Sequence, residues 1–168
     1  HRSGTGGTGR AGLTGQHWLQ PAWDPGLTIA HLSLAHFTAL GLKAAVLDVD
    51  RTLLPGRDVT LPEPVRVWLV DAGRRMKLHL FSNNPSKTRI AAVADQLGVS
   101  FTCGAGKPRR GALRRVVADL DCPPAEIAMV GDRLFTDVLC GNRLGLYTVL
   151  VRPVQADGRP SRHARVQR

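Results

Sequence analysis

Cysteine is scarce in this sequence, and its spacing excludes two common classes of site. The three cysteines, Cys103, Cys122 and Cys140, are far apart and form no CxxC pair, so neither a zinc ribbon nor a dithiol redox centre is expected. We expect reduced, packed thiols and a reducing, cytoplasmic environment, or an organelle interior in a eukaryote. The six histidines show no metal-ligand spacing either, and we assign none of them a catalytic role.

Long apolar runs are also missing. No run approaches the length that crosses a bilayer, so no transmembrane helix is expected. Residues 1–15 lack the apolar core of a secretory signal. The letters from Gly4 to Gly9 match GxGxxG. We reject a dinucleotide site there, because no strand pattern precedes these letters and no helix pattern follows them.

Acidic residues are few, and the excess of positive charge is uneven. The chain has 23 Lys and Arg against 13 Asp and Glu, a net charge of +10. Residues 21–151 hold 16 basic and 12 acidic residues, so the two ends carry the other +6. A basic tail of this composition is expected to be disordered. The alternative is that the basic ends bind an anionic membrane, RNA or the ribosome, with nucleic acid the less favoured partner.

Apolar segments with strand and helix patterns alternate five times along the chain. Strands are expected at about 44–48, 77–82, 99–103, 127–130 and 146–151, and helices at about 32–40, 62–73, 85–97, 109–120 and 134–144. This rhythm predicts an α/β fold, a three-layer Rossmann-like sandwich around a central five-stranded parallel sheet. We predict three segments: a flexible Gly-rich stretch at 1–18, one domain at 19–153 and a basic tail at 154–168.

Two carboxylates follow the first predicted strand. Side chains alternate in direction along an extended chain, so Asp48 and Asp50 can lean to the same side of one small site. In open parallel sheets, ligands bind at the carboxyl ends of the strands. A lone Asp-x-Asp is weak evidence, because surface turns contain it often.

Polar residues also follow the next three predicted strands. Ser82-Asn83-Asn84 could bind phosphate oxygens or simply cap a helix. Lys107 is either a mobile ammonium in the site or a solvated surface lysine. Asp132 and Asp137 offer hard oxygen ligands that suit Mg²⁺, or else cap a helix start. Each group alone is modest evidence for a functional site, but their order at successive strand ends makes the combination a specific signal for one.

This order resembles the motifs of the haloacid dehalogenase superfamily of phosphatases. The first motif is Asp48-x-Asp50-x-Thr52, the second Ser82, the third Lys107 and the fourth Gly131-Asp132 with Asp137. The run Leu47 to Pro55 and the Phe81-Ser82-Asn83-Asn84 stretch are similar to the small YqeG-like branch, subfamily IIIA, and to mitochondrial phosphatidylglycerophosphate phosphatases. Arg51 departs from the branch, which usually has Asn there, so the hydrogen bonding around the ligands is expected to differ.

The resemblance implies a Mg²⁺-dependent phosphomonoesterase that forms an aspartyl-phosphate. Asp48 would be the nucleophile, Asp50 the general acid and base, and Lys107 a catalytic cation. The implied metal residues are Asp48, Asp50, Asp132 and Asp137, and the implied substrate-binding residues are Thr52, Ser82, Asn83 and Lys107.

The two cap positions of the superfamily offer no room for a cap domain in this chain. We therefore expect an open site and a large phosphate-ester substrate, with phosphatidylglycerophosphate as the first choice. The alternatives are a non-enzymatic module that binds RNA, ribosome or anionic membrane, and a phosphotransferase. The sequence leaves the oligomeric state open.

Overall fold

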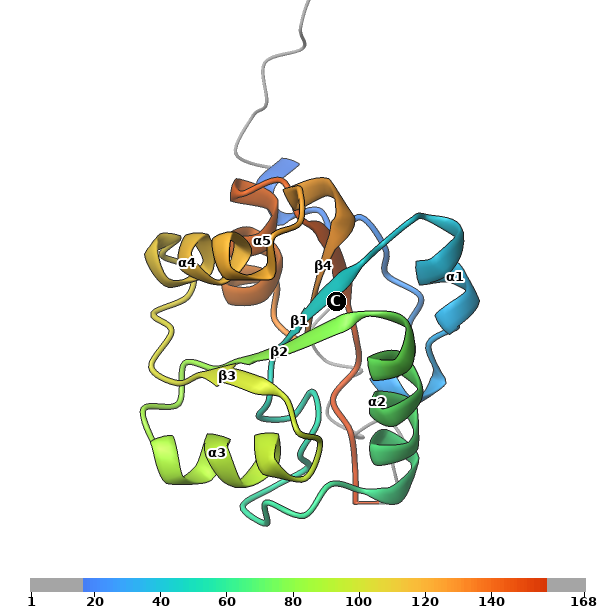
Figure 1. The fold of residues 1–168 in the computed structure, drawn as a ribbon, viewed down its shortest axis with the longest axis vertical. Helices are drawn as coiled ribbons and strands as arrows, with labels where there is room; N and C mark the ends of the chain where they lie inside the picture. Colours follow the sequence, from blue (N-terminus) through green and yellow to red (C-terminus); the bar gives the residue numbers. More distant parts are fainter. Residues whose placement is uncertain (1–16, 157–168) are drawn as a thin grey trace, which may run out of the picture.

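The computed structural model describes residues 17–156 and has one parallel sheet at its centre (Figure 1). Its five strands are β1 (Ala44–Leu47), β2 (Lys77–Phe81), β3 (Ser100–Thr102), β4 (Ile127–Gly131) and β5 (Tyr147–Leu150). They follow the order β3-β2-β1-β4-β5, and every neighbouring pair is parallel. This confirms the predicted α/β fold, and it makes β1 the central strand with β2 and β4 on either side.

Helices cover both faces of the sheet. They are α1 (Leu34–Ala39), α2 (Glu63–Arg75), α3 (Lys87–Asp95), α4 (Gly111–Leu120) and α5 (Leu139–Arg143), with short 3-10 turns at η1 (His17–Leu19), η2 (Ile29–His31) and η3 (Pro124–Glu126). Ala45 and Leu47 pack with α1, α2 and α3, whereas Ala44 and Val46 pack with α4 and α5. The strand's alternation thus divides the core into the two apolar layers of a sandwich.

Helix α2 is longer than the sequence predicted. Its buried face comprises Val65, Trp68, Leu69 and Ala72, as the helical spacing indicated. The predicted end at Gly73 is wrong, because the helix continues to Arg75. Gly73 has no left-handed backbone here, and a β carbon there would lie 3.6 Å from Leu78 Cδ1. Gly73 therefore lies inside α2, beside β2, and does not end the helix.

A π-helical turn replaces the first part of the helix predicted at 134–144. Leu134–Val138 (η4) is π-helical, and α5 follows directly. Asp137 lies in this turn and is almost fully buried. π-helical turns are rare and are frequently found at functional sites. The helical spacing of apolar residues over 134–144 does not reveal such a turn.

Both ends of the described chain are held by contacts. Asn142 donates from Nδ2 to the carbonyl oxygens of Trp18 (2.7 Å) and Gln20 (2.8 Å). Val154, assigned to the tail by the sequence, is instead buried and donates its N–H to the Arg51 carbonyl at 2.9 Å. The predictions for residues 1–16 and 157–168 lie outside the described residues. Within 17–156, no helix has the length and apolarity needed to span a bilayer.

Candidate active site

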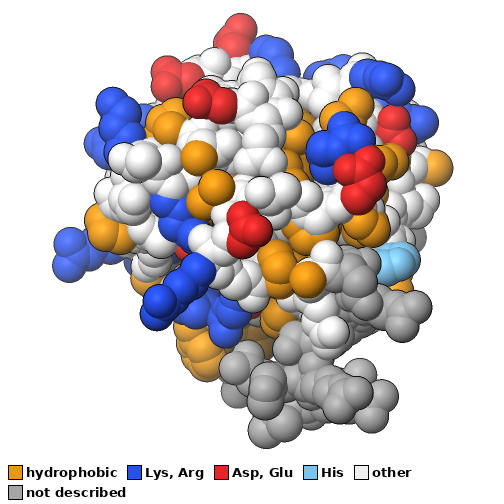
Figure 2. Space-filling model, turned by 90° about the horizontal axis from the view of Figure 1, so that it is seen from below, with side chains coloured by type: hydrophobic (Ala, Val, Ile, Leu, Met, Phe, Trp, Pro, Cys, Tyr) orange, Lys and Arg blue, Asp and Glu red, His pale blue; other side chains and the backbone are white. Residues whose placement is uncertain are grey.

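The predicted site residues come together at the carboxyl edge of the sheet. Asp48 follows β1, Ser82 follows β2, and Asp132 follows β4. The Asp48 N–H donates to the Val130 carbonyl at 2.9 Å, which continues the pairing of β1 with β4. The long loop after β1 lies at the bottom of Figure 1. Figure 2 looks onto this end of the molecule, where Lys and Arg side chains are spread among apolar and acidic ones.

Lys107 lies at the centre of the group. Its Nζ donates to Asp48 Oδ1 at 2.8 Å, to Asp137 Oδ1 at 2.6 Å and to the Phe81 carbonyl at 3.1 Å. Its side chain is only 2% exposed. Burial by itself lowers the pKa of this ammonium, but the carboxylates of Asp137 and Asp48 outweigh it, so the pKa of Lys107 is raised. Lys107 is therefore a fixed, charged group, not a solvated surface lysine.

The side chain of Asn83 holds the backbone of Lys107. Its Nδ2 donates to the Lys107 carbonyl at 3.0 Å, and its Oδ1 accepts from the Lys107 N–H at 2.7 Å. The predicted role of Asn83 is a contact with substrate phosphate; each of these bonds leaves one further N–H or lone pair on the amide, and Asn83 lines the cavity described below. Asn83 connects the end of β2 to the loop that carries Lys107, and Ser82 Oγ accepts from the Asn84 N–H at 3.1 Å.

Three carboxylates form a compact, electron-rich group. One oxygen from each of Asp48, Asp132 and Asp137 lies within 4.8 Å of the others. Burial and the charge of Asp48 raise the pKa of Asp132 to about 6 and that of Asp137 to about 7. Lys107 and Arg51 pair with this group and act in the opposite direction, but they do not offset burial and the charge of Asp48. Hard oxygen donors with excess negative charge fit a divalent cation.

Thr52 and Arg51 bind the carboxylates from the loop after β1. Thr52 is fully buried, and its hydroxyl lies 3.1 Å from Asp48 Oδ2 and 3.4 Å from Asp132 Oδ1. The predicted role of Thr52 is substrate binding; in the fold its hydroxyl lies between the Asp48 and Asp132 carboxylates. Arg51 has a left-handed backbone (φ 66°), and its Nη2 lies 3.2 Å from Asp132 Oδ2. Arg51 stands where the branch usually has Asn, and it thus places a guanidinium beside Asp132, a candidate metal ligand.

Asp50 has a partner that the sequence did not suggest. Arg89, on α3, contacts Asp50 Oδ1 from Nε at 3.1 Å and from Nη2 at 2.8 Å, and Asn84 Nδ2 donates to Oδ2 at 3.3 Å. Arg89 is 39 residues away along the chain and belongs to no motif. An arginine in the first turn of the helix after Ser82 was the only local signal, and surface helices contain such residues commonly.

A cavity of about 330 Å³ opens over these groups. It is lined by Asp48, Asp50, Ser82, Asn83, Asn84, Pro85, Lys107, Arg133 and Thr136. Arg133 and Thr136 were not predicted. The Arg133 N–H also donates to Asp137 Oδ2 at 3.2 Å. Because the cavity contains the nucleophile candidate, the lysine and a basic side chain, it is suited to a phosphate ester.

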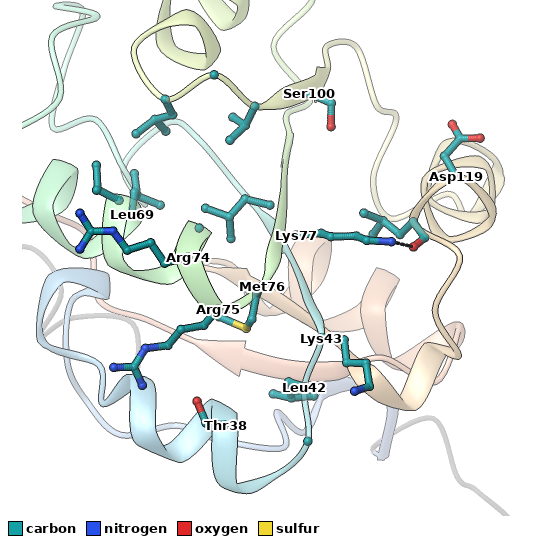
Figure 3. A pocket seen from close by; sticks show the side chains of 18 residues that line it. Thr38, Leu42, Lys43, Leu69, Arg74, Arg75, Met76, Lys77, Ser100 and Asp119 are labelled. Atoms are coloured by element: carbon teal, nitrogen blue, oxygen red, sulfur yellow. Dashed lines mark hydrogen bonds between the residues drawn. The ribbon is translucent and has the colours of Figure 1, made fainter.

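A larger hollow, of about 1380 Å³, lies at the opposite edge of the sheet (Figure 3). Basic side chains such as Lys43, Arg75 and Lys77 line it, and Lys77 Nζ donates to the Leu120 carbonyl at 2.9 Å. It contains none of the residues that gather around Lys107. Size alone therefore does not identify the reactive site.

Gly131 is required by the close approach of Asp137. A β carbon at residue 131 would lie 2.2 Å from Asp137 Oδ2, so Gly131→Ala should displace this carboxylate and lower the free energy of unfolding by about 1–3 kcal/mol. Chemical denaturation checks this. The matched control is Gly111→Ala in α4, where nothing lies within 4 Å of the added carbon. Equal stability of both variants would contradict the close packing of Asp137.

The fold and the site together define a hydrolase class, and sequence comparison gives the same class. The family model described as HAD-hydrolase-like matches residues 104–160. The chain is 30% identical over 132 residues to the Bacillus subtilis protein named "Probable phosphatase YqeG", which covers 77% of this chain and 76% of that protein. The chain belongs to the haloacid dehalogenase-like hydrolases, in the phosphatase branch that includes YqeG.

Two longer relatives carry a more specific name. The chain is 33% identical over 144 residues to "Phosphatidylglycerophosphate phosphatase 1, chloroplastic" of Chlamydomonas reinhardtii, and 30% identical over 135 residues to the chloroplastic/mitochondrial protein of the same name from Arabidopsis thaliana. The matches cover 79% and 71% of this chain. They span 52% and 37% of those two relatives.

Solved structures give the same fold. A hypothetical protein from Xanthomonas campestris has a TM-score of 0.56 at 18% identity, covering 85% of this chain and 80% of that one. A HAD superfamily subfamily IIIA hydrolase from Legionella pneumophila has a TM-score of 0.50 at 18% identity, covering 66% and 65%. At these identities the likeness concerns the fold, which agrees with the parallel sheet described above.

Proposed function

We propose that this protein is a magnesium-dependent phosphomonoesterase that acts through an aspartyl-phosphate on Asp48. The observation that carries the proposal is the buried contact of Asp48 Oδ1 with Lys107 Nζ at 2.8 Å, in a cavity that also contains Asp50. A carboxylate nucleophile must approach an anionic phosphate, and a fixed ammonium offsets that repulsion. Burial strengthens this effect, because water screens the charges less.

The reaction divides into two balanced steps. In the first, an oxygen of Asp48 forms a bond to phosphorus, the bond from phosphorus to the ester oxygen breaks, and Asp50 gives that oxygen a proton. In the second, Asp50 takes a proton from water, whose oxygen attacks phosphorus and releases inorganic phosphate from Asp48. Arg89 and Asn84 orient the Asp50 carboxylate, which is the form that takes the proton in the second step.

A divalent cation would be held by side-chain oxygens of Asp48 and Asp132 and by the Asp50 carbonyl. Asp137, already bound to Lys107 at 2.6 Å, would bind the cation through water. When bound, Mg²⁺ would supply charge neutralisation for the phosphoryl group. Thr52 keeps Asp48 and Asp132 at the spacing that such a site needs.

Cation affinity should increase with pH. The pKa of Asp132 is raised to about 6 by burial and by Asp48, so below that pH a cation must displace a proton. We expect Mg²⁺ to bind about tenfold more weakly at pH 5 than at pH 7.5. The reason is that pH 5 lies about one unit below the pKa of Asp132, and binding there displaces one proton. Isothermal titration calorimetry checks this. Asp132→Asn should remove both the affinity and its pH dependence, and an unchanged affinity at pH 5 would contradict the site.

Phosphatidylglycerophosphate is the substrate that we propose first. Two observations support it: the names of the Chlamydomonas and Arabidopsis relatives, and the absence of a cap domain within residues 17–156, where α2 alone separates β1 from β2 and α3 alone separates β2 from β3. An open site suits a head group presented at a lipid surface.

Turnover assays test the activity and the substrate separately. Hydrolysis of p-nitrophenyl phosphate with Mg²⁺, and its loss with a chelator, tests the phosphomonoesterase. Phosphatidylglycerophosphate in mixed micelles tests the substrate, and we expect a higher kcat/KM than for small phosphate esters. Equal values for both would remove the lipid from the proposal and leave the activity intact.

A further inference from the structure

A second hollow adjoins the candidate active site. Its volume is about 400 Å³, and it is lined by Asp50, Arg51, Leu54, Pro55, Gly56, Arg57, Asn84 and Arg89. Asp50 and Asn84 line this hollow as well as the cavity that contains Asp48. The two spaces are therefore neighbours that share Asp50 and Asn84.

Positive charge predominates in the second hollow. Three arginines and one carboxylate line it. Arg51 pairs with Asp132 at 3.2 Å, and Arg89 pairs with Asp50 at 2.8 Å. Arg57 is exposed, and within residues 17–156 its guanidinium forms no ion pair. The hollow thus has one guanidinium that is available to an anion, beside two more that are already oriented.

The wall that carries Arg57 is fixed before any ligand binds. Arg89 donates from Nη1 to the Arg57 carbonyl at 2.6 Å and from Nη2 to the Gly56 carbonyl at 2.8 Å. The same guanidinium contacts Asp50. These bonds tie the loop after β1 to helix α3. A preformed wall reduces the ordering cost of binding, so contacts made there contribute more to affinity.

The position of Asp50 determines what the second hollow would receive. In the proposed reaction, Asp50 protonates the ester oxygen that leaves, so the leaving alcohol lies on the side of Asp50. The second hollow is also lined by Asp50. We infer that it is an anion subsite for a phosphate group carried by the leaving alcohol, with Arg57 as its main donor. This inference rests on the proposed function, and it narrows the substrate class to phosphomonoesters whose alcohol carries a second phosphate.

Guanidinium chemistry suits this role. Arginine binds phosphate oxygens with two parallel N–H donors and stays charged at every working pH. A phosphodiester has the same oxygen geometry, so the subsite would accept a phosphate inside a chain as well as one at an end. The half-buried Pro55 on the same wall suits the carbon atoms between the two phosphates.

Two soluble esters test the inference with the full chain and Mg²⁺. One is glycerophosphoglycerol phosphate, which carries a phosphodiester beyond the scissile ester, and the other is glycerol 3-phosphate, which lacks it. We expect the wild-type kcat/KM to be about tenfold or more higher for the first, as for a charge-assisted hydrogen bond. Arg57→Gln should remove most of that preference. The matched control, Arg115→Gln, changes an exposed arginine on α4 and should retain it.

Each outcome decides one question. Turnover of neither ester nor of p-nitrophenyl phosphate by wild type would overturn the proposed function itself. Turnover of p-nitrophenyl phosphate without turnover of glycerophosphoglycerol phosphate would overturn the subsite alone. Equal turnover of both esters, or a preference that persists in Arg57→Gln, would overturn the subsite and leave the phosphatase intact. A preference that is absent for the soluble esters and arises only with phosphatidylglycerophosphate in anionic vesicles would assign it to the lipid surface. Stimulation of glycerol 3-phosphate turnover by added inorganic phosphate would assign it to a free anion, and both results contradict an attached phosphate.

Discussion

Asp48→Asn should lower the kcat for p-nitrophenyl phosphate by at least about three orders of magnitude, because an amide oxygen is a poor nucleophile toward phosphorus. The side chains are nearly equal in size, so the packing around Thr52 should survive. The substitution also removes a charge that raises the pKa values of Asp132 and Asp137, and the folded state should be at least as stable as wild type. Activity and stability should therefore separate in this variant.

The matched control is Asp119→Asn, an exposed carboxylate on α4 that lies away from the site. It should leave kcat unchanged. Wild-type protein quenched in acid during turnover should carry a phosphoryl group on Asp48 that intact-mass and peptide analysis detect, and Asp48→Asn should carry none. Residual turnover of Asp48→Asn at a tenth of the wild-type rate would exclude Asp48 as the nucleophile.

Lys107→Met should produce the largest loss of stability. The Lys107 side chain is 2% exposed and pairs with Asp48 and Asp137 at 2.8 and 2.6 Å. Without it, two buried carboxylates lack their main cation, and breaking a buried pair in this way lowers the free energy of unfolding by about 3–5 kcal/mol. Urea denaturation at neutral pH measures the loss. Lys87→Met, an exposed lysine on α3, is the control and should change little.

A double variant separates charge from packing. Adding Asp137→Asn to Lys107→Met removes one of the stranded carboxylates, so part of the lost stability should return. If the double variant is less stable than Lys107→Met, then packing and not charge dominates at this position. Activity should be lost in both variants, since the ammonium that faces Asp48 is absent.

The fold was largely predictable because the signals are local. The spacing of apolar residues within short segments predicts which segments are strands and which are helices. Five alternating pairs of strand and helix are compatible with few topologies. The ends of the elements were less predictable. Gly73 did not end α2, and a π-helical turn replaced the start of the last predicted helix. Both features depend on packing against the sheet, and the neighbouring residues in the sequence do not reveal that packing.

The candidate site was predictable in its membership but less so in its contacts. Asp48, Lys107, Asp132 and Asp137 were expected near one another, and one edge of the sheet carries them all. The sequence predicted substrate contacts for Thr52 and Asn83 but did not predict their bonds to Asp48 and to the Lys107 backbone. The Arg89–Asp50 pair was not expected at all.

By itself, the sequence determined which residue types stand at the end of each strand, because strand direction and side-chain alternation are properties of the local chain. Only the tertiary structure decided which of these groups is paired, buried or available. A charged side chain takes the partner that the surrounding elements bring within reach, and Arg89 reaches Asp50 from a helix 39 residues further along. Burial then sets the strength of each pair, since the dielectric around a charge depends on every element packed over it.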